Sequence, residues 1–130
     1  MKTRTVRQSV TVKAGPHRIY ETLLDSRKHA KLTGAKAKIG RKAGEKFTAF
    51  DGQIKGYTLE TFPNRKIVQL WRAEHWPNGH YSMATFSLKK VKSGTRLTLL
   101  QTDVPNNDYK DICQGWREFY WMPMKGMLKR

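Results

Sequence analysis

Acidic and thiol side chains are the groups most able to do chemistry in this chain, and their spacing gives them no catalytic partners. Asp51, Glu60, Glu74 and Asp103 lie in separate segments, without the paired carboxylates that a general acid and base would need. Cys113 is the single cysteine, and no recognisable nucleophile setting surrounds it, so we expect it to be buried as a small apolar residue. There is also no glycine-rich phosphate loop. These features favour a binding protein over an enzyme, with a cyclase- or hydrolase-like enzyme kept as an alternative.

The loop between residues 75 and 81 is the most distinctive short segment of the sequence. A proline, an asparagine and a glycine explain a hairpin turn there, but Trp76 and His80 are not needed for a turn. We expect these two side chains either to anchor the loop or to contact a ligand. His75 and His80 could suggest a metal, yet the third ligand would have to be Glu74 or a distant group. We therefore expect no metal and no cofactor.

Large rings and methionines recur at helical spacing near the C-terminus and in the predicted strands before it. Such side chains suit an adaptable apolar site, although aromatic stripes also serve simply to fill a protein core. The candidate ligand-binding residues are Trp71, Trp76, His80, Met83, Phe86, Trp116, Phe119, Tyr120 and Met124. Their expected ligand is a small apolar or amphipathic molecule.

The formal net charge of +16 creates a positive potential that attracts nucleic acid, anionic membranes or acidic proteins. Basic residues are densest before residue 47 but are interspersed there, which is typical of a solvated surface. A nucleic-acid-binding function is the alternative. Its candidate phosphate-contacting face consists of Lys28, Lys31, Lys36, Lys38, Arg41 and Lys42. The same charge would favour an anionic head group on a ligand, or an acidic partner protein.

Composition predicts one ordered domain over residues 1–130. Hydrophobic residues make up 38% of the chain and are spread along it, which is enough for a single core. No stretch approaches the ~20 apolar residues of a membrane-spanning helix, and the chain does not start with a signal-peptide pattern. A lone cysteine supports neither a disulfide nor a zinc site. We expect a cytoplasmic protein without membrane insertion.

The N-terminal third predicts one strand and two short helices. Residues 4–12 alternate polar and apolar, with valines on one side, as in a half-buried strand. A glycine-proline pair then begins a helix over residues 16–25, because proline is tolerated at a first helical position. Ser26 could cap a second helix over residues 27–33, and Gly34 ends it.

The middle of the chain has the closely spaced turns of an antiparallel sheet, which leave no room for crossover helices. The predicted strands cover residues 35–40, 45–51, 54–61, 66–75, 81–90 and 95–102. After Pro105 the apolar period becomes helical, with Asn106 or Asn107 as the cap. Gly115 and Pro123 interrupt this helix of about two dozen residues, so we expect a bend or a break.

Several residue strings, in this order, resemble one family. They are Pro16-His17-Arg18-Ile19-Tyr20 with Leu23 and Asp25; Lys28-His29-Ala30-Lys31-Leu32-Thr33-Gly34-Ala35; Gly44-Glu45-Lys46-Phe47; Ile67-Val68-Gln69-Leu70-Trp71-Arg72; Trp76-Pro77 with Gly79-His80-Tyr81-Ser82; Gly94-Thr95-Arg96-Leu97-Thr98-Leu99; and Gly115-Trp116 with Tyr120-Trp121. Together they cover nearly the whole chain and are similar to the homologues of the activator of the ninety-kilodalton heat-shock protein ATPase. That family lies in the superfamily of START lipid-transfer domains, polyketide cyclases and the birch pollen allergen (SRPBCC).

The resemblance implies an α+β helix-grip fold, in which an antiparallel meander of about seven strands wraps a long C-terminal helix. It also implies a cavity between sheet and helix, and a co-chaperone-like role in stress response with a chaperone-type partner protein. The chaperone-activating member carries a separate N-terminal domain that this sequence does not contain, so we expect partner docking without full activation.

Overall fold

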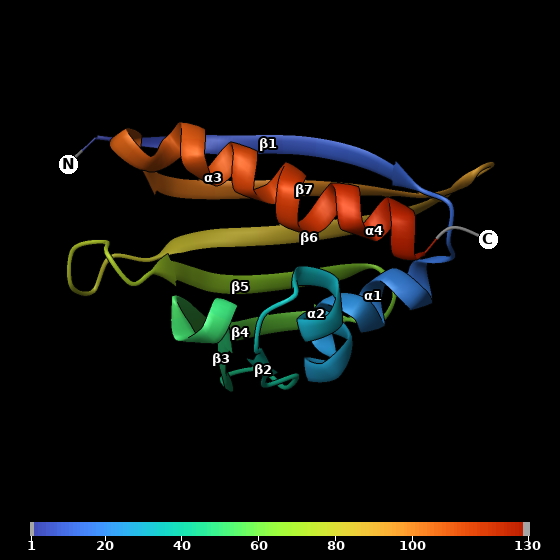
Figure 1. Ribbon diagram of the computed structural model, residues 1–130, viewed down its shortest axis with the longest axis horizontal. Helices are drawn as coiled ribbons and strands as arrows, with labels where there is room; N and C mark the ends of the chain where they lie inside the picture. The colour runs from blue at the N-terminus through green and yellow to red at the C-terminus, as the bar shows by residue number, and fades with distance from the viewer. Residues whose placement is uncertain (1, 129–130) are drawn as a thin grey trace.

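A seven-stranded antiparallel sheet is covered on one face by helices in the computed structural model, which describes residues 2–128 (Figure 1). The strands are β1 (Thr3–Val12), β2 (Lys38–Ile39), β3 (Lys46–Ala49), β4 (Ile54–Phe62), β5 (Lys66–Ala73), β6 (Ser82–Val91) and β7 (Gly94–Pro105). Their spatial order is β1-β7-β6-β5-β4-β3-β2, so β2 to β7 form a meander and β1 pairs with β7. The predicted α+β helix-grip fold is confirmed.

Period-two alternation decides which side chains each strand buries. On β1, Val6, Val10 and Val12 are buried as predicted, while the residues between them face solvent or are half-buried. On β6, Phe86 is buried and Met83 is exposed, because residues three apart point to opposite faces of a strand. We call the face that packs against the helices the inner face and the opposite one the outer face.

Two short helices, α1 (Pro16–Leu24) and α2 (Ser26–Thr33), follow β1. The prediction that Ser26 caps α2 was wrong, because Asp25 takes the extended conformation and its carboxylate accepts the Lys28 N–H at 3.0 Å. Ser26 is instead the first residue of α2, and its hydroxyl accepts the Ile39 N–H at 2.8 Å. Gly34 ends α2 as predicted, at φ +77°. The serine therefore ties α2 to the edge strand β2.

A long helical stretch follows β7 and crosses the inner face of the sheet (Figure 1). It consists of η2 (Asn106–Asp108), α3 (Tyr109–Trp116), η3 (Arg117–Trp121) and α4 (Met122–Met127). No side-chain cap forms at its start, so the prediction of an asparagine cap was wrong. The chain stays helical through Gly115 and Pro123. The expected break does not occur, and the irregularity in the helix is η3, a π-helical turn in which the Met122 N–H donates to the Arg117 carbonyl.

Three predicted strands were too long. The one predicted over residues 66–75 ends at Ala73. The one predicted over residues 35–40 contains only Lys38 and Ile39, and the one over 45–51 ends at Ala49. The strand over 45–51 ends early because Phe50, Asp51 and Gly52 have φ of +51°, +57° and +93°, which no strand permits. They form η1 (Phe50–Gly52), which turns the chain over the edge of the sheet.

The sheet and helices share one core of buried apolar residues that runs from β1 to the C-terminal helix. Cys113 is buried in it as an unpaired thiol, as predicted. Within residues 2–128, none of the helices combines the length and apolar character needed to cross a membrane. The core thus fixes the C-terminal helix on the sheet and leaves the outer face bare.

Candidate functional site

An open apolar cleft lies where the C-terminal helix meets η1 and the start of β4. Its volume is about 170 Å³. It is lined by Phe50, Gln53, Ile54, Trp71, Asp111, Ile112, Gly115, Trp116, Phe119 and Tyr120, and we call it the apolar cleft. Among these described lining residues, Asp111 alone carries a charge. This surface could therefore accept an apolar side chain or a small apolar group.

Phe50 forms the rim of the apolar cleft through a strained backbone. A bulky residue at positive φ is an outlier, and such strain persists only where the surroundings enforce it. The enforcing contacts come from Asp51, whose N–H donates to the Lys36 carbonyl at 3.1 Å and whose carboxylate accepts the Lys36 N–H at 2.9 Å. The ring of Phe50 then packs edge-on against Phe119 and Tyr120, at centroid distances of 5.7 and 6.0 Å.

The helix presents two exposed apolar side chains, and one of them, Phe119, lines the apolar cleft. Phe119 is 46% exposed and Met122 is 67% exposed, which is high for side chains of their size. The π-helical turn η3 brings Trp116 and Trp121, five residues apart, into a near-parallel stack at 5.6 Å. Tyr120 and Trp121 are therefore both directed inward, and Phe119 is left at the surface.

The interior beneath the helix is filled by rings. Trp116 contacts Trp71, Phe86 and Tyr120 at centroid distances of 5.8, 5.6 and 4.5 Å. The enclosed void among these rings has a volume of about 10 Å³, enough for at most about one water molecule. This void among the described rings is too small for an organic guest.

Hydrogen bonds from the indole rings lock the helix to the sheet. Trp116 Nε1 donates to the Gln101 carboxamide oxygen at 2.8 Å, and the nitrogen of that carboxamide donates to Ser82 Oγ at 2.9 Å. Trp121 Nε1 donates to the Gln8 side chain at 2.6 Å. A buried polar group is costly without a partner, so these bonds specify how the rings sit. They make the base of the apolar cleft rigid.

His29 and Tyr120 form a buried pair between α2 and the helix. His29 Nδ1 lies 3.0 Å from the Leu23 carbonyl and must donate to it, so the neutral ring accepts the Tyr120 hydroxyl proton at Nε2, 2.8 Å away. Desolvation by burial lowers the pKa of His29, although the Leu23 carbonyl opposes this shift. Burial likewise raises the pKa of Tyr120. The pair is therefore neutral and acts as a structural link.

The structure does not bring the sequence-predicted ligand residues together in one place. Trp71, Trp116, Phe119 and Tyr120 line the apolar cleft, while Phe86 borders only the small void. Met124 is fully buried in the core. Met83 was misplaced by the prediction: it is 41% exposed on the outer face, because its neighbours Ser82 and Ala84 occupy the inward positions of β6.

Trp76 and His80 lie in the loop between β5 and β6 and do not line the apolar cleft, although the Trp76 ring packs against Trp71 at 5.5 Å. Trp76 is buried and its Nε1 donates to the Asp108 carboxylate at 2.7 Å. His80 Nε2 donates to the Asp103 carbonyl at 2.8 Å. These bonds fix the loop to the end of β7 and to the start of the helical stretch, which favours anchoring over ligand contact. Within residues 2–128, no three His, Cys, Asp or Glu side chains gather as a metal site would require.

Arg72 completes the anchoring of that loop. It is buried, and its guanidinium donates to the Trp76 and Pro77 carbonyls at 2.9 Å each. Its Nε has no partner, and the ring of Tyr81 lies 5.8 Å from its charge. Carbonyl dipoles hold this cation, and among residues 2–128 no carboxylate forms an ion pair with it.

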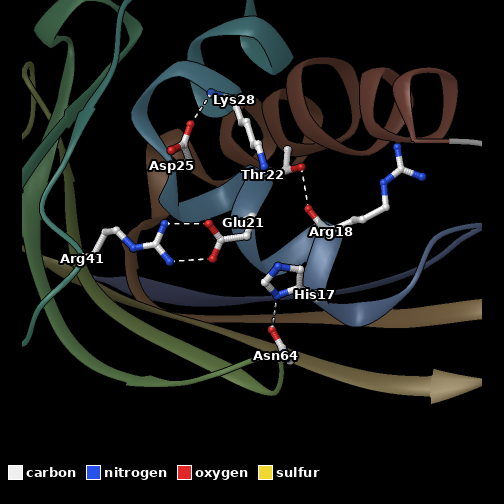
Figure 2. Close-up of polar contacts among 8 residues, drawn as sticks. All are labelled: His17, Arg18, Glu21, Thr22, Asp25, Lys28, Arg41 and Asn64. Carbon is white, nitrogen blue, oxygen red and sulfur yellow. Dashed lines mark hydrogen bonds and ion pairs between the residues drawn. The ribbon is translucent and has the colours of Figure 1, made fainter.

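The candidate phosphate-contacting residues are all exposed, on α2 and around β2. One of them is already paired: Arg41 makes two parallel hydrogen bonds to Glu21, of 2.9 and 2.6 Å (Figure 2). The bonds to Arg41 lower the pKa of the Glu21 carboxyl, and those to Glu21 raise the pKa of Arg41. The backbone N–H of Lys28 donates to the Asp25 carboxylate, so the Lys28 ammonium group takes no part in that hydrogen bond (Figure 2).

Sequence reasoning missed six residues that line the apolar cleft: Phe50, Gln53, Ile54, Asp111, Ile112 and Gly115. Ile112 and Gly115 precede Phe119 by seven and four residues, so helical spacing could have placed them on one side with it. Nothing in the sequence near Phe50 signals a left-handed conformation, because only Asp51-Gly52 is a turn pattern.

Comparison with known proteins identifies relatives over nearly the whole chain. A family model described as "Activator of Hsp90 ATPase homolog 1-like protein" matches residues 13–129. An uncharacterized protein of Schizosaccharomyces pombe is 29% identical over 125 residues, which is 96% of this chain and 37% of that protein. The human Activator of 90 kDa heat shock protein ATPase homolog 1 is 26% identical over 115 residues, which is 88% of this chain and 34% of that protein.

A solved structure agrees with these matches. The crystal structure of an HSP90 activator from Plasmodium falciparum superposes with a TM-score of 0.81 at 25% identity. The match covers 91% of this chain and 90% of that chain. This chain spans little more than a third of the two curated relatives.

Proposed function

This chain belongs to the family of Activator of Hsp90 ATPase homolog 1-like proteins, and from that membership we propose that it is a non-enzymatic module that docks a chaperone-type ATPase at the apolar cleft. Two relatives are named or titled as activators of such a chaperone, which supports a partner of this class. The proposal concerns docking and leaves the activation of the partner's ATPase to be measured.

The observation that carries the proposal is the contrast between the filled interior and the open apolar cleft. The void of about 10 Å³ admits no organic guest, whereas the apolar cleft of about 170 Å³ is open at the surface. This volume is below the roughly 300–1,000 Å³ of usual small-molecule sites. A shallow apolar depression of this size suits one or two side chains of a partner protein.

The surroundings of the apolar cleft have the features of a protein-binding hot spot. Such sites place aromatic anchors on a rigid base, so that little freedom is lost on binding. Phe119 is already exposed there and held by the ring of Phe50. Trp71 and Trp116 form a base that hydrogen bonds keep in place. Desolvation of these rings by a partner would supply the binding free energy.

Truncation of one exposed ring tests the proposal. Binding of a purified Hsp90-type ATPase to the full chain is measured by calorimetry, with stimulation of ATP hydrolysis recorded in parallel. Phe119→Ala should weaken binding by about tenfold or more, because a hot-spot truncation costs about 2 kcal/mol. Phe62→Ala removes a ring of similar exposure, 39%, at the distant end of β4 and should leave binding unchanged. Equal effects of both variants, or no binding by the wild type, would refute docking at the apolar cleft.

A second candidate function is the binding of a small apolar molecule at the same place. Trp71, Trp116 and Tyr120 line both the apolar cleft and the small void, so movement of one ring would join the two spaces. Titration with fatty acids and aromatic compounds, read by tryptophan quenching and thermal shift, tests this function. If these compounds quench tryptophan fluorescence equally in the wild type and in Phe119→Ala, the ligand binds outside the apolar cleft.

A further inference from the structure

Three exposed lysines surround an exposed threonine on the outer face of the sheet, where β2, β3 and β4 lie side by side. Thr48 is directly opposite Lys38 on one side and Lys55 on the other, and Lys46 is two positions before it on β3. Adjacent strands are about 4.8 Å apart and alternate residues about 7 Å apart, so these side chains leave the sheet close together. Lys38 and Thr48 also line two open hollows, which keeps them accessible. We call Lys38, Lys46 and Lys55 the lysine cluster.

Neighbouring acids do not pair with the lysine cluster. Among residues 2–128, neither of the two ion pairs includes one of its members. The acids nearest to it along the chain bind backbone amides instead. The Glu45 carboxylate accepts the Lys42 N–H at 2.8 Å, and the Asp51 carboxylate accepts the Lys36 N–H at 2.9 Å. The ammonium groups of the lysine cluster are therefore available to an external anion.

Two tyrosine rings lie beside the lysine cluster on the same face. Tyr57 is directly opposite Lys46, and its ring centroid is 6.0 Å from that of Tyr81. Both tyrosines are half-buried, so the sheet holds each ring in place while part of it remains open to solvent. The buried guanidinium of Arg72 lies 5.8 Å from the Tyr81 ring centroid and adds positive charge beneath this surface. Aromatic rings and unpaired cations are thus combined within a few strands.

Acidic side chains limit the extent of this surface. Glu60 is exposed farther along β4, directly opposite Val68, and Asp103 is exposed near the end of β7. Both would repel a polyanion. The favourable surface therefore runs from β3 to the start of β6, three strand spacings or about 14 Å. This length suits roughly four nucleotides, the lower end of the site sizes of single-strand-binding folds.

We infer that this end of the outer face binds a short stretch of single-stranded nucleic acid. Its phosphates would lie at the lysine cluster and its bases would stack on Tyr57 and Tyr81, which is how single-strand-binding surfaces combine cations with rings. A duplex hides the faces of its bases, and an acidic peptide has no bases, so both would gain only the attraction between charges. A second copy of this chain would bring another net charge of +16 and be repelled.

This inference is independent of the proposed function, because neither the lysine cluster nor the two tyrosines line the apolar cleft. The probe is fluorescein-labelled oligo(dT) of about twelve nucleotides, long enough to cover the whole surface. Its affinity for the full chain is measured by fluorescence anisotropy at about 0.15 M salt. A DNA duplex of the same length and a poly-glutamate peptide of the same charge serve as comparison ligands. Oligo(dT) should bind more tightly than both, and tighter binding of either comparison ligand would overturn the inference.

Two charge-reversal variants separate this surface from bulk charge. Lys38→Glu/Lys46→Glu should weaken oligo(dT) binding about tenfold or more, and the slope of log affinity against log salt should fall by about one. Arg18→Glu/Lys110→Glu changes the net charge equally at exposed positions of α1 and α3 and should leave the affinity within about twofold. Equal losses in the two variants would reduce the binding to net charge and contradict a site on the outer face.

Tyr57 provides a test of base stacking that leaves every charge in place. Tyr57→Leu keeps an apolar side chain on β4 but removes the ring, so oligo(dT) affinity should fall about tenfold while that of the glutamate peptide stays unchanged. Tyr57→Phe retains the ring and should bind like the wild type. Thermal melting followed by circular dichroism checks that both variants fold. Wild-type affinity in Tyr57→Leu, or an equal loss for the glutamate peptide, would refute stacking on this face.

Discussion

The hydrogen bond between Trp116 and Gln101 offers the sharpest test of how helix and sheet are joined. Replacing Trp116 with phenylalanine removes the indole N–H that donates to the Gln101 carboxamide at 2.8 Å. It also removes ring atoms that pack against Trp71 and Phe86. The smaller ring leaves a buried carboxamide oxygen without its donor and enlarges the void beside it.

Both consequences destabilise the folded state. An unsatisfied buried polar group costs about 1–3 kcal/mol, and partial loss of a buried ring adds about 1 kcal/mol. We therefore expect Trp116→Phe to lower the free energy of unfolding by about 2–4 kcal/mol. For a chain of this length that corresponds to a fall in melting temperature of about 6–16 °C.

A double-mutant cycle isolates the hydrogen bond from the packing loss. Unfolding by urea, followed by circular dichroism, is measured for Trp116→Phe, for Gln101→Leu and for the two combined. The combined variant should be less destabilised than the sum of the single variants, by about 1 kcal/mol or more, because neither partner is then left alone. Strict additivity, or a loss below about 1 kcal/mol for Trp116→Phe, would refute the reasoning.

Three other perturbations have expected outcomes. Burial lowers the pKa of His29 below its usual 6.5, so the imidazole binds a proton more readily in the unfolded chain than in the folded one. The contribution of His29 to folding stability should therefore be full above pH 6.5 and should fall as the pH drops below 6.5. Melting temperatures of His29→Gln should lack this decline between pH 6.5 and 5. Gly56→Ala would place a Cβ against the Leu70 carbonyl, and we expect it to lose more than about 3 kcal/mol or fail to fold, as urea unfolding would reveal. Arg41→Ala breaks only the exposed pair with Glu21 and should change stability by less than about 1 kcal/mol, whereas a larger change would give that pair a structural role.

Local sequence patterns predicted the elements well where one physical rule decides. The alternating valines of β1 and the proline that begins α1 follow such rules, and both predictions are confirmed. The closely spaced turns predicted a meander for the same reason. The rules were insufficient at residues 35–40, where only Lys38 and Ile39 form a strand, and the Ile39 N–H donates to the Ser26 hydroxyl of α2.

The composition of the candidate site could be predicted only in part. The rings at helical spacing indicated Trp116, Phe119 and Tyr120, which do line the apolar cleft. Met83 and Phe86 are three residues apart on one strand, so period-two alternation alone could have excluded one of them. The positive φ of Phe50 depends on contacts with residue 36, which is distant along the chain, and no local pattern encodes it.

The π-helical turn was also beyond local rules. Pro123 predicted an interruption, since proline removes a hydrogen bond and clashes with the preceding turn. The chain resolves this conflict by widening the turn just before it, which keeps the helix continuous and stacks Trp116 on Trp121. Whether a proline breaks or widens a helix is decided by the tertiary packing around it.

Amide chemical-shift mapping tests the central claim most directly. The labelled full chain is titrated with an unlabelled Hsp90-type ATPase, and perturbed amides and indole N–H groups are assigned. Docking at the apolar cleft predicts that the changes concentrate at residues 50–54 and 111–120, with Trp116 Nε1–H among them. Changes confined to the outer face or to the loop around Trp76, with residues 111–120 unperturbed, would contradict it.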